Sequence, residues 1–87
     1  MATKTKLYTP KFIEDFDYWR EADPKLCERI ERLVEETARD PFGGIGRPEP
    51  LRHELQGCWS RRINQEHRLV YRVTKEAVTF LQCRKHY

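Results

Sequence analysis

The sequence predicts an α+β domain, in which an N-terminal strand and a two-helix hairpin pack on a small antiparallel sheet. Two helical periodicities occupy the first half of the chain, and three strand-like runs of alternating residues occupy the second half. Short connectors between the strand-like runs favour antiparallel pairing, and the separation of helices from strands is typical of an α+β architecture. The 87 residues are expected to form one domain, residues 1–87.

The helical hairpin is expected to follow a short first strand at residues 4–8. Thr9 and Pro10 predict the start of the first helix, because a threonine hydroxyl caps free N–H groups and proline suits the first helical turn. Asp23 and Pro24 repeat this signal for the second helix. Both helices carry apolar stripes at helical spacing, which we expect to form the core. The stripes consist of Phe12, Ile13, Phe16 and Trp19 in the first helix and Leu26, Cys27, Ile30, Leu33, Val34 and Thr37 in the second.

The second helix is expected to end before Pro41, because proline disfavours the helical conformation at Asp40. The segment 41–50, PFGGIGRPEP, contains three glycines and three prolines and is predicted to be a loop. It is not a phosphate-binding P-loop, since no Gly-Lys-Ser/Thr follows and no strand precedes it.

The three strand-like runs are CWSRRIN, HRLVYRVT and AVTFLQCR, at residues 58–64, 67–74 and 77–84. In the middle run, Leu69, Tyr71 and Val73 alternate with Arg68, Val70 and Arg72. One face of the sheet is therefore expected to receive the helices, and the other is expected to be basic and open. Arg62 shares a face with Ser60, but the strand register that would place either beside Arg68 is not fixed by the sequence.

The charge distribution is asymmetric. The chain carries 17 Lys and Arg against 14 Asp and Glu, a formal charge of +3. The excess of basic residues lies entirely in the segment 47–87, and acidic residues dominate the segment 14–36. This asymmetry favours a polyanionic partner, although an ordinary solvated surface explains the charge equally well.

No apolar run approaches the roughly 18 residues of a membrane span, and the N-terminus shows no apolar signal region, so a cytoplasmic protein without membrane contact is expected. Cys27, Cys58 and Cys83 cannot all pair internally and lack metal-ligand spacing. They are expected to be reduced structural thiols, and no metal or cofactor is expected.

Glu49, Arg68 and His86 are the residue types that metal-independent RNA cleavage requires. In such a reaction the 2′-OH attacks the phosphate, so that a base, an acid and a cation beside the phosphorus are needed. By type alone, these residues describe a small non-catalytic RNA-binding module equally well.

The stretch DPFGGIGRPEPLRHELQGCWSRRINQEHRLVYRVT, together with the terminal CRKHY, closely resembles the YoeB toxin family of the RelE-like superfamily. The resemblance implies a RelE-like, microbial-ribonuclease-like fold and a ribosome-dependent endoribonuclease that cleaves mRNA in the A site. It also implies a YefM-type antitoxin as partner. Members of the family form homodimers, but nothing in this sequence marks a dimer face.

The resemblance further implies four catalytic roles. Glu49 matches the general base of the family and His86 its general acid. Arg68 matches the arginine that stabilises the scissile phosphate, and Tyr87 matches the terminal tyrosine that orients the substrate nucleotide.

Three more residues match substrate-side positions. Arg52 and Arg62 match residues that contact RNA, and Glu66 is a candidate for orienting a catalytic group. Cys58 and Lys85 depart from the aromatic residues common at their positions, but neither replaces the proposed acid, base or phosphate clamp. A degenerate relative that only binds RNA or ribosomes is the alternative, and such a copy should have lost one of these three groups.

Overall fold

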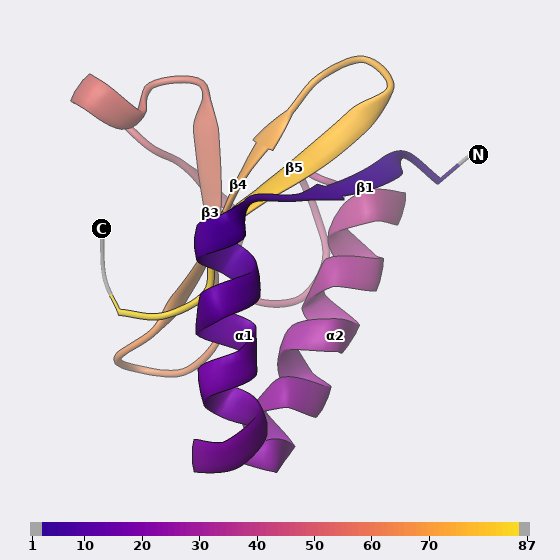
Figure 1. The fold of residues 1–87 in the computed structure, drawn as a ribbon. Coiled ribbons are helices and arrows are strands. Elements are labelled where there is room, and N and C mark those ends of the chain that lie inside the picture. The colour runs from indigo at the N-terminus through magenta and orange to yellow at the C-terminus, as the bar shows by residue number, and fades with distance from the viewer. Residues whose placement is uncertain (1–2, 86–87) are drawn as a thin grey trace.

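The structure, a computed structural model, describes residues 3–85. Figure 1 shows two helices lying side by side, with the strands of a twisted sheet beyond them. In chain order the elements are β1 (Thr5–Tyr8), α1 (Pro10–Ala22), α2 (Pro24–Arg39), β2 (Glu49–Pro50), a 3₁₀ helix (His53–Leu55), β3 (Cys58–Arg62), β4 (Arg68–Val73) and β5 (Ala77–Gln82). None of the helices in the described part of the chain is long and apolar enough to cross a membrane.

Both predicted helix starts are confirmed. The Thr9 hydroxyl accepts a hydrogen bond from the Phe12 N–H at 3.1 Å, and a carboxylate oxygen of Asp23 accepts from the Leu26 N–H at 3.2 Å. Each side chain satisfies a backbone donor that has no partner within its own helix. Helix α2 ends at Arg39, before the Asp40–Pro41 step, as predicted.

The predicted apolar stripe of α2 is buried throughout, but that of α1 is wrong at one position. Ile13 is 51% exposed, whereas Asp15 is buried. Helical periodicity alone predicted that Ile13 would be in the core. In the fold, Asp15 is held by two partners, the Lys11 ammonium at 2.7 Å and the Cys83 N–H at 3.1 Å. A paired carboxylate can therefore occupy a core position.

The sheet has the strand order β1-β5-β4-β3-β2. The predicted antiparallel pairing of the three C-terminal runs is confirmed, and β2 adds to β3 in the same sense. Strand β1 pairs parallel to β5, with Thr5 opposite Ala77, so that the five-stranded sheet is mixed. The fold class is thus the predicted one. The sequence did not indicate the parallel edge, because one isolated strand carries no information about its partner.

Apolar clusters lie on both faces of the sheet. The larger cluster joins the two helices to the sheet and includes Trp19, Ile30, Leu33, Tyr71 and Phe80. The smaller cluster lies on the opposite face and contains Leu51, Cys58 and Val70, with Leu55 and Leu81 packed against it. The expectation of a fully open basic face is therefore wrong. Val70 interrupts the basic residues of β4, and the segment that follows β2 covers it.

Arg61 is buried on the helix side of the sheet, although the next residue in the sequence, Arg62, is exposed. Its side chain is 0% exposed. It donates to the carbonyl oxygens of Ile45 (2.7 Å), Asp40 (2.5 Å) and Gly43 (2.7 Å), and its Nε lies 3.3 Å from the Tyr71 hydroxyl. Arg61 therefore fixes the loop that leads to β2.

The three cysteines are free and buried, as predicted. Burial raises the pKa of the Cys27 and Cys83 thiols, so that little reactive thiolate exists at neutral pH. We expect a thiol reagent such as DTNB at pH 8 to label the native protein far more slowly than the unfolded protein in guanidinium chloride. A native thiol that reacted at the rate of a free cysteine would contradict the buried placement.

Candidate functional site

Glu49 lies at the start of a row of residues that crosses four strands on the face opposite the helices. Glu49 on β2 is opposite Ser60 on β3, Ser60 is opposite Val70 on β4, and Val70 is opposite Gln82 on β5. Residues that are directly opposite in an antiparallel pair point to the same face. Ser60 is buried, and its hydroxyl makes no hydrogen bond within the described part of the chain.

Arg62 and Arg68 form the adjacent pair on this face. They are directly opposite one another on β3 and β4, and Arg62 lies two residues beyond Ser60, so its side chain points to the same side. Directly opposite side chains have Cβ atoms about 4.5–5.5 Å apart, and like charges at that separation destabilise a sheet. A pair of arginines placed in this way is suited to one bound anion, which would offset the repulsion.

The two arginines differ in their burial and hydrogen bonds. Arg68 is half-buried, and its Nη1 donates to the carbonyl oxygens of Asn64 (3.0 Å) and His67 (3.4 Å). Among residues 3–85 its Nε and Nη2 have no hydrogen-bond partner. The Arg62 side chain is exposed and makes no hydrogen bond in the same range. The face thus combines one guanidinium that binds the turn 64–67 with one that makes no hydrogen bond among residues 3–85.

The loop before β2 brings Glu49 to the sheet through two devices. Arg61 binds the carbonyl groups of the loop from within, and the Arg62 N–H donates to the Gly46 carbonyl at 2.6 Å. Gly46 has a φ of 83°, and a Cβ there would lie 3.1 Å from the Arg61 Cβ and 3.2 Å from the Arg62 oxygen. Only glycine allows this close approach. The sequence predicts a loop at Glu49, whereas in the structure Glu49 lies in the two-residue strand β2.

The segment after β5 runs beside α1 and the turn that precedes β4. The predicted strand 77–84 ends earlier than expected, at Gln82. Residue Lys85 then lies against β4, because its carbonyl oxygen accepts from the Arg68 N–H at 3.3 Å. The peptide that precedes His86 is therefore fixed beside Arg68. His86 and Tyr87 themselves lie outside the described residues.

Two predicted substrate residues are not part of this row. Arg52 lies beyond β2, at the residue that precedes the 3₁₀ helix, and is exposed. Glu66 is exposed in the turn between β3 and β4, where its N–H donates to the Asn64 side chain at 2.9 Å. The structure thus brings Glu49, Arg62 and Arg68 onto one face. The roles of all seven residues stay predictions.

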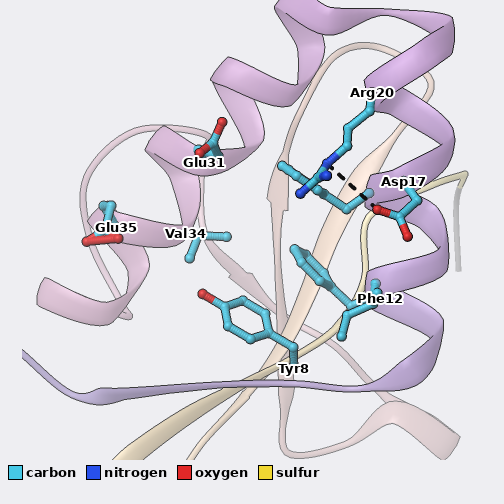
Figure 2. Close-up of a pocket in the computed structure, with 9 residues that line it drawn as sticks. Tyr8, Phe12, Asp17, Arg20, Glu31, Val34 and Glu35 are labelled. Atoms are coloured by element: carbon cyan, nitrogen blue, oxygen red, sulfur yellow. Dashed lines mark ion pairs between the residues drawn. The ribbon is translucent and has the colours of Figure 1, made fainter.

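A groove between α1, α2 and β1 lies away from this row (Figure 2). Its lining is largely apolar, and Asp17 and Arg20 form an ion pair of 3.7 Å at its rim. The lining residues are Tyr8, Phe12, Ile13, Phe16, Asp17, Arg20, Glu31, Val34 and Glu35. The five predicted site residues within the described part of the chain do not line it. Within residues 3–85, no three His, Cys, Asp or Glu side chains gather as a metal site would require.

Sequence comparison gives one family match and close relatives. Residues 8–87 match the family described as "YoeB-like toxin of bacterial type II toxin-antitoxin system". The chain is 56% identical over 80 residues to the protein named Toxin YoeB of Mycobacterium bovis, and the match covers 92% of this chain and 94% of that protein.

The solved structures that resemble the whole fold include the following two. A YoeB dimer from Staphylococcus aureus superposes with a TM-score of 0.88 at 38% identity and covers 99% of this chain and 100% of that one. A heterotetrameric YoeB-YefM toxin-antitoxin complex from the same organism superposes with a TM-score of 0.86, also at 38% identity and with the same coverage.

Proposed function

Because this chain belongs to the YoeB-like toxins of bacterial type II toxin-antitoxin systems, we propose that it is a ribosome-dependent endoribonuclease that cleaves mRNA in the A site and so inhibits translation. One observation carries the proposal beyond family membership. A carboxylate and two directly opposed arginines share one face of the sheet, with Glu49 opposite Ser60 and Arg62 opposite Arg68. The peptide before His86 is bound to the Arg68 backbone beside them.

In the proposed reaction the 2′-OH of the substrate attacks the adjacent phosphorus. Glu49 takes the proton of the 2′-OH, and the O2′–P bond forms as the P–O5′ bond breaks. His86 gives a proton to the leaving 5′ oxygen, and Tyr87 orients the nucleotide. The products are a 2′,3′-cyclic phosphate and a 5′-hydroxyl, so that no water or metal-bound hydroxide is consumed in this step.

The two arginines would stabilise the charge that develops on the phosphate oxygens. Donors placed where charge develops in the transition state typically contribute about 10²–10³ in rate. Arg68 is suited to this task because the turn 64–67 already holds one end of its guanidinium. Arg52 and Arg62 would contact the RNA, and Glu66 would orient a catalytic group.

The ribosome would align the substrate. In-line attack requires a flexible RNA strand to be held with its 2′ oxygen, phosphorus and 5′ oxygen in line. Correct alignment is worth about 7–11 kcal/mol of the activation barrier in favourable cases. An A-site codon that the ribosome holds in place would provide this alignment, and a toxin that acts there would work in the cytoplasm.

A YefM-type antitoxin is the proposed neutralising partner, since a similar protein is solved as a YoeB-YefM complex. A homodimer is likewise proposed from the solved YoeB dimer.

The test uses ribosomes programmed with an mRNA that carries a single 2′-deoxynucleotide on the 5′ side of the scissile bond. We expect the all-ribose mRNA to be cut with a 2′,3′-cyclic phosphate end, and the deoxy mRNA to remain intact. Equal cleavage of both would reject attack by the 2′-OH. Binding to ribosomes without cleavage of either mRNA would favour the alternative function, a non-catalytic RNA- or ribosome-binding module.

A further inference from the structure

His67 makes an unusual contact for a residue of a turn, because its ring binds the backbone close to the end of the chain. The Lys85 N–H donates to His67 Nδ1 at 2.7 Å. Arg68, which follows His67, binds the other backbone group of Lys85, because the Arg68 N–H donates to the Lys85 carbonyl oxygen at 3.3 Å. The backbone N–H and carbonyl group of Lys85 are therefore held by two consecutive residues at the start of β4.

His67 is itself fixed in place. Its N–H donates to the Asn64 side chain at 2.8 Å, and its carbonyl oxygen accepts from the Ile63 N–H at 3.0 Å. Its ring meets the Trp19 ring edge to face, with centroids 4.7 Å apart and planes at 75°. The Nδ1 atom of the imidazole is the acceptor of the Lys85 hydrogen bond, and the ring edge-to-face contact with Trp19 holds the imidazole plane in place.

The two residues before Lys85 are also held, in both cases by α1. The Cys83 N–H donates to the buried Asp15 carboxylate at 3.1 Å, and the Cys83 carbonyl oxygen accepts from the Trp19 indole at 2.9 Å. The Arg84 guanidinium lies over the Tyr18 ring at 3.5 Å from its centroid. Trp19 thus contacts both the segment 83–85 and the histidine that binds it.

Lys85 has a left-handed backbone, with a φ of 67°. A residue other than glycine adopts this conformation at an energetic cost, and it persists only where the surroundings enforce it. The hydrogen bond to His67 and the bond from Arg68 supply that enforcement. Without the histidine acceptor, one of the two bonds that impose the turn is lost.

We propose that His67 is a positioning residue, which fixes the direction in which the chain continues from Lys85 into the proposed general acid. This inference rests on the proposed function, because His86 is assigned as the acid there. Two consecutive residues would then have two roles in the site. Arg68 would supply the phosphate-binding guanidinium, and His67 would fix the direction from which the acid approaches. No sequence pattern indicates this role, because the two partners are 18 residues apart and the histidine belongs to no predicted catalytic set.

Two substitutions separate the acceptor from the ring. His67→Phe keeps a ring against Trp19 but removes the acceptor, whereas His67→Asn removes the ring but keeps a carbonyl oxygen close to the position of Nδ1. We expect His67→Phe to lower kcat for cleavage of ribosome-bound mRNA by roughly 10–100-fold with KM changed less than about threefold, because misplacement of a reacting group by about 1 Å costs on that order. His67→Asn should recover most of the lost kcat.

A second measurement does not depend on catalysis. Hydrogen exchange of the Lys85 amide, followed by NMR, should be at least about tenfold faster in His67→Phe than in the wild type, and close to wild type in His67→Asn. Spectra of both variants should retain the dispersion of the folded protein. If the wild type cleaves no mRNA, the proposed function fails, and this exchange rate still tests the contact.

Three outcomes would overturn the inference. The first is a His67→Phe protein with wild-type kcat. The second is an unchanged exchange rate of the Lys85 amide in that variant. The third is a loss of kcat that His67→Asn does not recover, which would assign the effect to the ring and not to the hydrogen bond.

Discussion

Replacement of Glu49 with Gln is expected to lower kcat for cleavage of ribosome-bound mRNA by about 10²–10⁴-fold, the contribution typical of a general base. Gln has nearly the same shape and can still accept hydrogen bonds, but it cannot take the proton of the 2′-OH. The loss corresponds to about 3–5 kcal/mol of transition-state stabilisation. Because the change leaves the fold and the arginine pair intact, binding to ribosomes should change little.

The matched control is Glu54→Gln. Glu54 is an exposed glutamate in the 3₁₀ helix, five residues from Glu49, and it is not part of the row of paired residues. Its replacement removes the same charge from the same surface and should leave kcat within about twofold of wild type. Single-turnover cleavage measured for both variants would separate loss of the base from loss of charge. Equal rates for Glu49→Gln and wild type would remove Glu49 from the mechanism.

Replacement of Arg61 with Met is expected to lower the free energy of unfolding by about 3–5 kcal/mol, a large part of the total stability of a small domain. Arg61 is fully buried and binds three loop carbonyl groups and the Tyr71 hydroxyl. Met fills much of the same space but leaves these acceptors without a donor, and an unsatisfied buried polar group costs about 1–3 kcal/mol.

The neighbouring residue provides the control. Arg62→Ala removes an exposed side chain on the opposite face, and its free energy of unfolding should stay within about 0.5 kcal/mol of wild type. The two variants should therefore have opposite effects on stability and on activity. Arg61→Met loses stability in urea titrations, whereas Arg62→Ala keeps stability and loses cleavage or RNA binding. If Arg61→Met does not fold, Arg61→Lys, which retains one donor group, should still fold, with a stability below that of the wild type. If Arg61→Met and Arg61→Lys both fold with wild-type stability, the role assigned to Arg61 is contradicted.

This pair of arginines also shows where prediction from sequence ends. Alternation along the run 58–64 predicted that Arg62 shares a face with Ser60, and the structure confirms this, with Arg61 on the other face. The sequence did not reveal that the residue on the helix side is buried. Its partners are backbone carbonyl groups of a loop some 16–21 residues away, and every residue has such groups, so no motif marks them.

Contacts between residues close in sequence could be predicted, whereas contacts between distant residues could not. A helix cap such as Thr9 or Asp23 acts on a backbone donor three residues away, so both partners are visible in one short stretch. The register that places Glu49 near Arg62 and Arg68 depends on pairing across three strands. The family resemblance identified those three residues, whereas periodicity could not set them on one face.

The parallel pairing of β1 with β5 has a consequence for folding during synthesis. Thr5 is synthesised long before Ala77, yet the two residues are partners in the finished sheet. Contacts so distant in sequence form late, because the intervening chain must first be ordered. The edge of the sheet and the anchored segment 83–85 can assemble only after that segment has left the ribosome that makes it.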